Sequence, residues 1–354
     1  MIDELISMMK EEYIDGFFIS NPSNVQYITG YREEHVYAVI TKRGQYLIID
    51  GRYKELAAME CLGFEILVWN EDGRGLTETI NDIVIKDKVN RLGFEAEYIT
   101  YKQFTELYDI IKAEITPVIG LVEQLRVIKT PEEISYLRQA CDITERAYNN
   151  ILNDIKVGIS EKELVAKANY YLRIEGGDPK TSETVFLSGK RSSLIVALPT
   201  DKKIEYGDFV LINIGARYKG YLVDFSRTVV VGEPTERQEE IYSVVQKAQM
   251  EAIKGIKGGV LAKEPYYASK KVLEEAGYLK YHYKKMGHGI GLFLYEEPFL
   301  CKSSKNILVK NNVLTVEPGI YIPGWGGVRI EDVILVTEDG YEILTKTPRD
   351  LMIL

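Results

Sequence analysis

The sequence predicts an α/β protein of two domains, and three observations support this. Its 354 residues exceed the roughly 100–200 residues that a single domain of ordinary size covers. Helical patterns alternate with short strand-like runs over residues 1–121, as in α/β domains. A strong helix start at Thr130 then marks a change of pattern. We therefore predict a first domain over 1–121, a linker over 122–131 and a second domain over 132–354.

Short strands and two helices are predicted in the first domain. Runs rich in β-branched and aromatic residues predict strands over 16–19, 37–40, 46–49 and 91–95. The turn Lys42-Arg43-Gly44 joins the second of these strands to the third. Apolar residues at helical spacing predict helices over 3–12 and 101–111.

The second domain is predicted to begin with helices and to continue with strands. Thr130 supplies a capping hydroxyl, a proline follows it, and two acids then stand at the positive end of the helix dipole. We expect this helix to end near residue 154, and a second helix to begin after a cap at Ser160. After Ser182 strands dominate, with one helical interval near 235–257.

The composition limits what the protein can do. Of its residues, 45% are hydrophobic and 27% are charged, which is typical of folded globular proteins. The formal net charge of -9 argues against nucleic acid as a partner, because such a partner needs a basic surface. No apolar run approaches the ~20 residues that span a bilayer, and the first residues, Met1-Ile2-Asp3-Glu4, are acidic where a signal peptide is basic. We therefore expect a cytoplasmic protein without membrane contact, whose three cysteines are reduced.

Four side chains in strand or turn contexts are candidates for chemistry: Asp224, His288, Glu317 and Glu331. One imidazole and three carboxylates suit a divalent ion such as Mn, Co, Fe or Zn. Each of them alone is weak evidence, because an acid in a strand more often faces solvent or pairs with a basic residue. The inference therefore depends on the four residues occurring together.

Longer motifs place these residues in a family pattern. Over residues 122–354 the chain resembles Xaa-Pro dipeptidases (prolidases) and aminopeptidase P in the order and spacing of its motifs. The motifs are Gly207-Asp208, Gly215-Ala216, Gly220-Tyr221, Asp224-Phe225-Ser226-Arg227-Thr228, Gly287-His288-Gly289-Ile290-Gly291, Glu317-Pro318-Gly319-Ile320-Tyr321 and Gly327-Val328-Arg329-Ile330-Glu331-Asp332. The resemblance implies a creatinase-like N-terminal domain and a pita-bread C-terminal domain that holds two metal ions bridged by a hydroxide.

The resemblance also implies five metal ligands, one of which differs from the family. The matching positions are Asn213, Asp224, His288, Glu317 and Glu331. The family has aspartate at the position of Asn213. A carboxylate carries a full charge and can chelate, whereas an amide offers only a neutral carbonyl oxygen. We therefore expect one divalent ion rather than two.

Three further histidines that the family places near its metals are absent. By spacing, their positions are those of Val196, Lys284 and Tyr295, and His282 lies two residues from the second of these. In the family these histidines position the substrate and donate hydrogen bonds to its carbonyl oxygen. Tyrosine and lysine can still donate hydrogen bonds, whereas valine cannot. We therefore expect slow turnover of ordinary Xaa-Pro dipeptides.

The resemblance implies a metallohydrolase that cleaves a small peptide or amide bond through a metal-bound water. Glu317 is the expected general base, with Tyr295 and Lys284 as further catalytic groups. Tyr295, Tyr321 and Arg329 are expected to contact the substrate. The family also implies a homodimer.

Two other functions stay open from the sequence. The creatinase branch of this fold hydrolyses a small amidino compound without metal, and some pita-bread domains only recognise other macromolecules. In either case the metal site can be empty. Asp224, Glu317 and Glu331 are then hydrogen-bonded to Arg227 and Arg329. Lys284 is a further cation that can neutralise them. Metal content separates the peptidase from both alternatives.

Overall fold

The computed structural model describes residues 1–33, 35–71, 73–179 and 184–354. The chain forms two compact units, Met1–Arg126 and Val127–Leu354. The segment that we predicted as a linker contains most of helix α6 (Leu121–Arg126), whose first two residues are buried in the core of the first unit. Within the described residues, no helix is both long and apolar enough to cross a membrane.

The first unit is built on one mixed sheet of six strands, in the order β4-β3-β2-β1-β5-β6. Strand β1 pairs antiparallel with β2 and parallel with β5, so it lies at the centre of the sheet. The strands are β1 (Gly16–Ile19), β2 (Tyr37–Thr41), β3 (Gln45–Ile49), β4 (Glu65–Val68), β5 (Arg91–Glu95) and β6 (Glu114–Val118). The predicted hairpin is the antiparallel pair β2–β3, in which Ile40 lies opposite Gln45.

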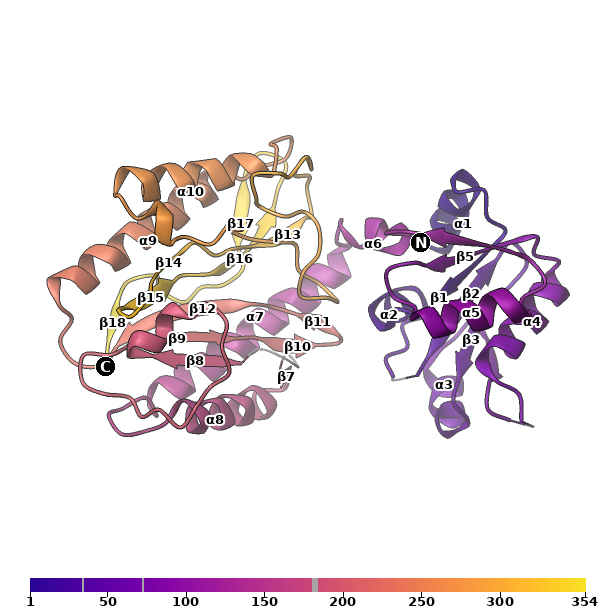
Figure 1. Cartoon of the computed structure of the whole chain (residues 1–354), viewed down its shortest axis with the longest axis horizontal. Coiled ribbons are helices and arrows are strands. Elements are labelled where there is room, and N and C mark those ends of the chain that lie inside the picture. The colour runs from indigo at the N-terminus through magenta and orange to yellow at the C-terminus, as the bar shows by residue number, and fades with distance from the viewer. Residues whose placement is uncertain (34, 72, 180–183) are drawn as a thin grey trace. The chain divides into compact units, whose positions relative to one another are not determined.

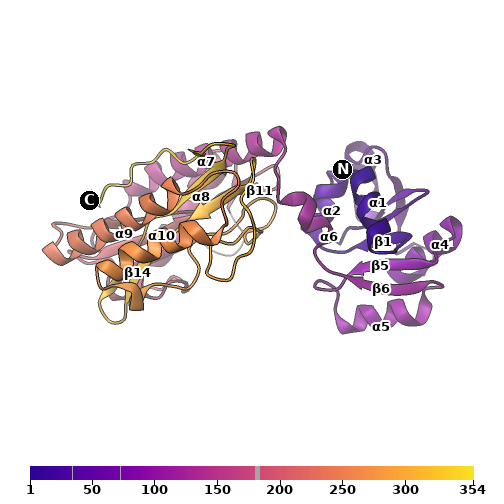
Figure 2. The ribbon, with the colours of Figure 1, turned by 90° about the horizontal axis from the view of Figure 1, so that it is seen from above.

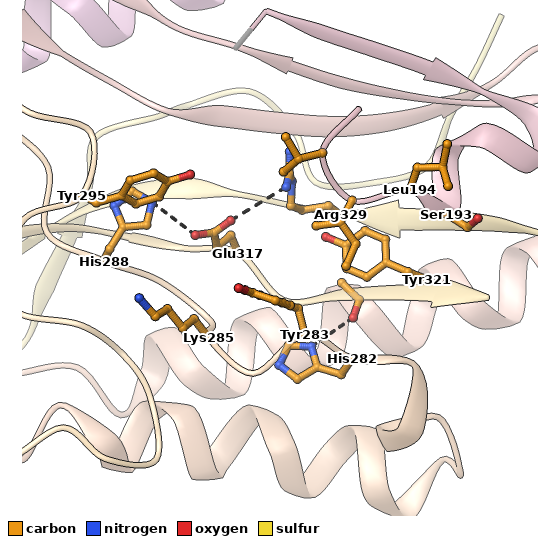
Figure 3. A pocket seen from close by; sticks show the side chains of 13 residues that line it. Ser193, Leu194, His282, Tyr283, Lys285, His288, Tyr295, Glu317, Tyr321 and Arg329 are labelled. Atoms are coloured by element: carbon orange, nitrogen blue, oxygen red, sulfur yellow. Dashed lines mark hydrogen bonds and ion pairs between the residues drawn. The ribbon is translucent and has the colours of Figure 1, made fainter. Parts of the chain in front are cut away.

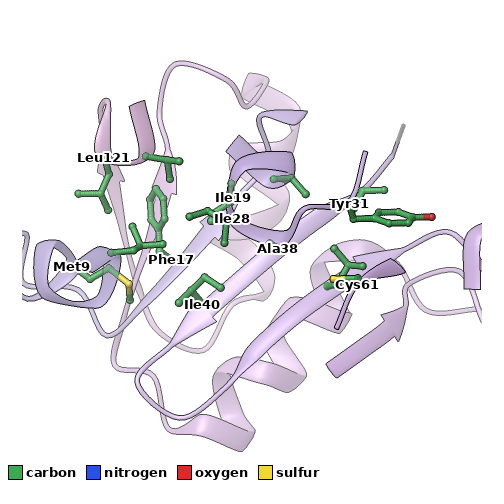
Figure 4. Packing of buried hydrophobic residues seen from close by; sticks show 14 of the residues in the cluster. Met9, Phe17, Ile19, Ile28, Tyr31, Ala38, Ile40, Cys61 and Leu121 are labelled. Atoms are coloured by element: carbon green, nitrogen blue, oxygen red, sulfur yellow. The ribbon is translucent and has the colours of Figure 1, made fainter. Parts of the chain in front are cut away.

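Helices cover both faces of this sheet, because β1 has apolar side chains on both of its faces. Phe17 and Ile19 pack into one buried cluster, and Phe18 packs into another. Figure 4 shows the first cluster, where Met9 of α1 lies near Phe17 and Ile40. Figure 2 shows α1 and α5 on opposite sides of β5. The helices are α1 (Ile2–Glu11), α2 (Pro22–Thr29), α3 (Lys54–Glu60), α4 (Leu76–Asp87) and α5 (Tyr101–Ile110), with a short 3-10 turn at Gly51–Tyr53.

Three helices of the second unit begin at capping residues. The side chain of Thr130 accepts a hydrogen bond from the backbone N–H of Glu133, and the Glu133 carboxylate accepts one from the backbone N–H of Thr130. The same reciprocal box stands at Ser160 and at Thr235. Each box satisfies N–H groups that the first turn of a helix leaves without partners. The helices that follow are α7 (Pro131–Leu152), α8 (Glu161–Ile174) and α9 (Glu236–Lys254).

The helical interval predicted near 235–257 is helix α9, and a second helix that we did not predict follows it. Helix α10 (Lys263–Glu275) follows α9 and packs against it. Proline usually ends a helical pattern, but Pro265 lies in the first turn, where the N–H that it lacks would have no helical partner in any case. The predicted interval is therefore confirmed, whereas the expectation that it is the one helical interval among the strands was wrong. Ser182, where we placed the onset of the strands, lies outside the described residues.

Several small sheets meet in the second unit and position the site. In Figure 1 they lie between the pair α9 and α10 and the pair α7 and α8. Strands β9 and β12 pair antiparallel, with Asn213 opposite Ser226, and a β-bridge joins Ser226 to Glu331. The strands are β7 (Asp178–Pro179), β8 (Val185–Ser188), β9 (Phe209–Ile214), β10 (Ala216–Tyr218), β11 (Tyr221–Leu222), β12 (Phe225–Val230), β13 (Val313–Val316), β14 (Gly319–Ile322), β15 (Gly326–Arg329), β16 (Asp332–Val336), β17 (Tyr341–Ile343) and β18 (Met352–Ile353), with 3-10 turns at Gly189–Ser193 and Leu279–Tyr281.

Candidate active site

A cavity of about 690 Å³ opens in the second unit (Figure 3). Its wall is formed by residues 193–196, by the segment that leads to His288, and by strands β14 and β15. Glu317, which connects β13 to β14, also lines it. Such a volume accommodates a small peptide.

The segment that carries His288 fits closely between its neighbours. A Cβ atom at Gly287 would lie 2.0 Å from the carbonyl oxygen of Thr315, so only glycine allows this approach. The backbone N–H of Thr315 donates to the carbonyl of His288 at 2.8 Å, which fixes the histidine beside β13. The Gly-His-Gly pattern is therefore required for packing, and it holds the imidazole in a buried position.

Asp224, His288 and Glu331 form a buried cluster. Each offers one ligand atom, and these atoms all lie within 4.8 Å of one another, which makes the cluster a candidate metal site. Asp224 stands just before β12, and Glu331 lies between β15 and β16. The Ser226 hydroxyl donates to Oε2 of Glu331 at 2.6 Å. The structure thus brings together three of the five predicted ligands, from three distant parts of the sequence.

Asn213, the fourth predicted ligand, turns its amide nitrogen toward these acids. Nδ2 donates to Oδ1 of Asp224 at 2.8 Å, to Oγ of Ser226 at 2.8 Å and, at 3.3 Å, to Oε2 of Glu331. An ionised carboxylate only accepts hydrogen bonds, so the amide N–H₂ is the half of Asn213 that suits this place. The side chain is 3% exposed, which leaves water little access to it.

Glu317, the fifth predicted ligand, stands beside the cluster rather than within it. Its Oε1 lies 3.3 Å from Nε2 of His288, and its Oε2 lies 4.0 Å from Nη1 of Arg329. Both contacts are drawn in Figure 3. The side chain is 19% exposed, so it is more open to the cavity than the clustered residues are.

The imidazole of His288 is oriented by its backbone contact. Its Nδ1 lies 2.9 Å from the carbonyl oxygen of Gly289, which can only accept, so Nδ1 carries the hydrogen and Nε2 faces Glu317. Burial lowers the pKa of His288, but the contact with Glu317 and the negative charge of Asp224 outweigh it and raise the pKa to about 9. In the neutral form the hydrogen on Nδ1 leaves the lone pair on Nε2, which is the arrangement of histidine ligands in metal sites.

Arg329 and Tyr321 line the cavity next to Glu317, where we expected substrate contacts. Arg329 donates from Nε to the hydroxyl of Ser226 at 2.9 Å. Burial lowers the pKa of its guanidinium, but Tyr321 and Glu331 outweigh this and raise the pKa, so the group stays charged. Burial raises the pKa of Tyr321 to about 12, so its phenol stays neutral and can donate a hydrogen bond.

Of the three positions without the family histidine, two line the cavity. Tyr295 packs its ring edgewise on His288, with ring centroids 4.7 Å apart. Val196 also lines the cavity and is 61% exposed. Lys284 is exposed and does not line the cavity, whereas its neighbour Lys285 does.

Arg227 donates to a neighbouring acid and to the backbone beside the cluster. Its Nη2 donates to Oδ1 of Asp332 at 2.8 Å, and it reaches only the backbone carbonyl of Glu331, at 2.7 Å. These contacts of Arg227 go to Asp332 and to a backbone carbonyl, whereas the alternative function paired it with the acids of the metal site. Three features were not predicted: the hydrogen bond of Ser226 to Glu331, the ion pair of Asp332 with Arg227, and Lys285 in the cavity lining. The signal for Ser226 was available, because alternation along β12 puts it on the same side as Asp224.

Comparisons with known proteins agree with this geometry. Residues 135–338 match metallopeptidase family M24, and residues 1–128 match the creatinase/prolidase N-terminal domain. The uncharacterized peptidase YqhT of Bacillus subtilis is 40% identical, with 100% of this chain and 99% of YqhT covered. The Xaa-Pro dipeptidase of Pyrococcus furiosus is 36% identical, with 99% of each chain covered. The solved structure of an Xaa-Pro dipeptidase from Bacillus anthracis has a TM-score of 0.95 and 38% identity, with 100% of this chain and 99% of that chain covered.

Proposed function

The chain belongs to metallopeptidase family M24, and we propose that it hydrolyses the amide bond of a small Xaa-Pro-type peptide with the help of one divalent ion. The matches confirm the predicted peptidase with a creatinase-like N-terminal domain and a pita-bread domain. They do not favour the metal-free creatinase-like hydrolase or the silent binding protein. The observation that carries the proposal is the contact of the Asn213 amide with Asp224 and Glu331.

The donor set fits one ion better than two. Asp224, His288 and Glu331 offer two carboxylates and an imidazole at close range, a set that suits Mn, Co, Fe or Zn. A second ion at the same site needs a further ligand atom that can donate electrons to it. The Asn213 side chain instead directs its N–H groups toward Asp224. We therefore propose that Asp224, His288 and Glu331 hold one ion. The Asn213 amide then occupies the position at which the family binds a second metal ion.

Glu317 is proposed as the general base. Asp224, His288 and Glu331 would hold the divalent ion, and the chemistry it would supply there is polarisation of the scissile carbonyl and a more nucleophilic water. The Glu317 carboxylate is at the cavity surface and is held between His288 and Arg329, so it can accept the proton of the attacking water and pass it to the leaving nitrogen. Its position outside the clustered ligands supports this role over that of a ligand.

The remaining cavity residues are proposed to orient the substrate. Tyr295 and Arg329 both line the cavity near Glu317 and can donate hydrogen bonds to a carbonyl oxygen. Tyr321 offers a neutral phenol on the same wall. Lys284 is exposed outside the cavity, which speaks against the catalytic role that we expected for it.

Substitution of the general base tests this proposal. We expect Glu317→Gln to lower kcat for Xaa-Pro dipeptides by about 10²–10⁴-fold, the range of general acid–base catalysis, because the amide cannot accept the proton. The measurement is hydrolysis of a panel of such dipeptides with Mn or Co added. Glu338→Gln, at an exposed glutamate that does not line the cavity, is the matched control and should keep the parental rate. A Glu317→Gln protein as fast as this control would refute the role of Glu317.

A homodimer and a cytoplasmic location are also proposed. The dimer is supported by the family resemblance alone. The location is supported by three cysteines without disulfides, Cys61, Cys141 and Cys301. Burial raises the pKa of the Cys61 thiol to about 11, so this thiol is inert at neutral pH. Light scattering on the purified chain measures the oligomeric state directly.

A further inference from the structure

We propose that Lys129 is a positioning residue, which holds Tyr295 against His288 through an ion pair with Glu296. This inference rests on the proposed function and adds to it a residue outside the cavity lining. Nζ of Lys129 lies 3.0 Å from Oε2 of Glu296, and the two side chains are 1% and 8% exposed. A pair buried to this degree keeps its geometry, because either charge without its partner would be costly there.

The lysine end of the pair is tied to the strand beside the metal-site histidine. The backbone N–H of Lys129 donates to the carbonyl of Asn311 at 2.9 Å. Asn311 stands two residues before β13, where the N–H of Thr315 donates to the carbonyl of His288 at 2.8 Å. The ammonium group of Lys129 therefore extends from backbone that is hydrogen-bonded next to the site.

The glutamate end of the pair closes the turn over residues 289–296. The backbone N–H of Glu296 donates to the carbonyl of Gly289 at 2.9 Å, and its carbonyl accepts from the N–H of Gly289 at 2.8 Å. Oε1 of Glu296 accepts from the backbone N–H of Phe293 at 2.9 Å. A Cβ atom at Gly291 would lie 2.8 Å from Oε2, so the turn wraps closely around the carboxylate. The carboxylate of the ion pair is thus the centre of this turn.

The same turn contacts two parts of the candidate site. Tyr295 packs its ring on His288, with ring centroids 4.7 Å apart, and Figure 3 shows both side chains at the cavity. The carbonyl of Gly291 accepts from the N–H of Leu222 at 2.8 Å, two residues before Asp224. A displaced turn would therefore misplace the phenol that we assign to the substrate, and a misplacement of about 1 Å costs about 10²-fold in rate.

Removal of both partners of the ion pair tests the inference. The variant is Lys129→Met/Glu296→Gln, which leaves no unpaired buried charge and keeps an oxygen that can accept from Phe293. One positive and one negative charge are lost together, so the net charge beside the acids of the metal site is unchanged. We expect kcat for Xaa-Pro dipeptides with Mn added to fall at least ~10-fold and KM to change less, because a misplaced donor acts on the transition state.

Action through Tyr295 predicts that the effects are not additive. In the Tyr295→Leu background, the same double substitution should lower kcat by less than ~2-fold, because the group to be positioned is already absent. Lys202→Met/Asp208→Asn is the matched control, since it removes a pair at 2.7 Å in the same unit and neither residue lines the cavity. The control should keep the parental kcat. An equal loss in the parental and Tyr295→Leu backgrounds would overturn the inference.

The histidine signals in the NMR spectrum of the metal-free protein give a readout that does not depend on hydrolysis. The chain has three histidines, so the signal of His288 is assigned by substituting the other two. We expect this signal in Lys129→Met/Glu296→Gln to move toward its position in Tyr295→Leu, and to stay in place in the control. An unmoved signal would overturn the role of Lys129. A parent protein that hydrolyses no dipeptide, with the signal moved as expected, would overturn the proposed function but not the placement of Tyr295.

Discussion

Hydrolysis of Xaa-Pro dipeptides by this protein is expected to be at least ~100-fold slower than by a family member that has histidine at the positions of Val196, Lys284 and Tyr295. Loss of a single group that stabilises the developing oxyanion typically costs about 10²–10³ in kcat. Val196 has no hydrogen to donate, and Lys284 is exposed and does not line the cavity. Tyr295 lies on His288 and is the remaining donor at these three positions.

The comparison is best made with both enzymes under the same conditions. Initial rates on several Xaa-Pro dipeptides with Mn or Co would be measured, and the Glu317→Ala variant would serve as the blank for each preparation. Rates close to those of the complete enzyme that disappear in this variant would contradict the expectation. They would mean that Tyr295, with Lys285 or Arg329, replaces the missing histidines.

Replacement of Arg227 by methionine is expected to lower the free energy of unfolding by about 3–5 kcal/mol, the cost of removing one partner from a buried ion pair. Arg227 is 1% exposed, and it donates to Asp332 and to the backbone carbonyls of Thr347 and Pro348. Methionine fills a similar volume, but it removes the positive charge and the hydrogen bond that stabilise the buried carboxylate of Asp332. Asp332 directly follows Glu331, so the metal cluster should be disturbed as well.

Urea unfolding followed by circular dichroism measures this loss. Arg138→Met is the matched control, because Arg138 pairs with Glu342 on the surface, where both side chains are more than 40% exposed. Such pairs contribute about 0–1 kcal/mol. If the two variants lost equal stability, the buried network around Asp332 would not have the structural role that we assign to it.

Much of the fold could be predicted from local sequence signals. The caps at Thr130 and Ser160 predicted the starts of α7 and α8, because a hydroxyl and a glutamate three residues later satisfy the free N–H groups of a first turn. Helix α10 was missed because it begins without a capping side chain and contains Pro265. The helix α6 lies where a linker was predicted, since its burial depends on contacts that are distant in the sequence.

The residues of the site could be predicted from the sequence, but the directions of their side chains could not. The spacing of the motifs led to Asp224, His288 and Glu331, which the structure brings within 4.8 Å. The sequence could not tell which of two adjacent lysines faces the cavity, since that depends on the pairing of the segment with Cys301. Nor could it tell that the Asn213 amide turns its nitrogen toward the acids, because the three acceptors around it come from other strands.

The number of metal ions per chain tests the central claim most directly. Elemental analysis would be made on the protein as purified without added metal, and again after incubation with Mn or Co and removal of excess ions. We expect about one ion per chain, and about two in Asn213→Asp, because the new carboxylate replaces N–H donors with a charged ligand. About two ions per chain in the unaltered protein would contradict the claim that the Asn213 amide stands in place of the second metal.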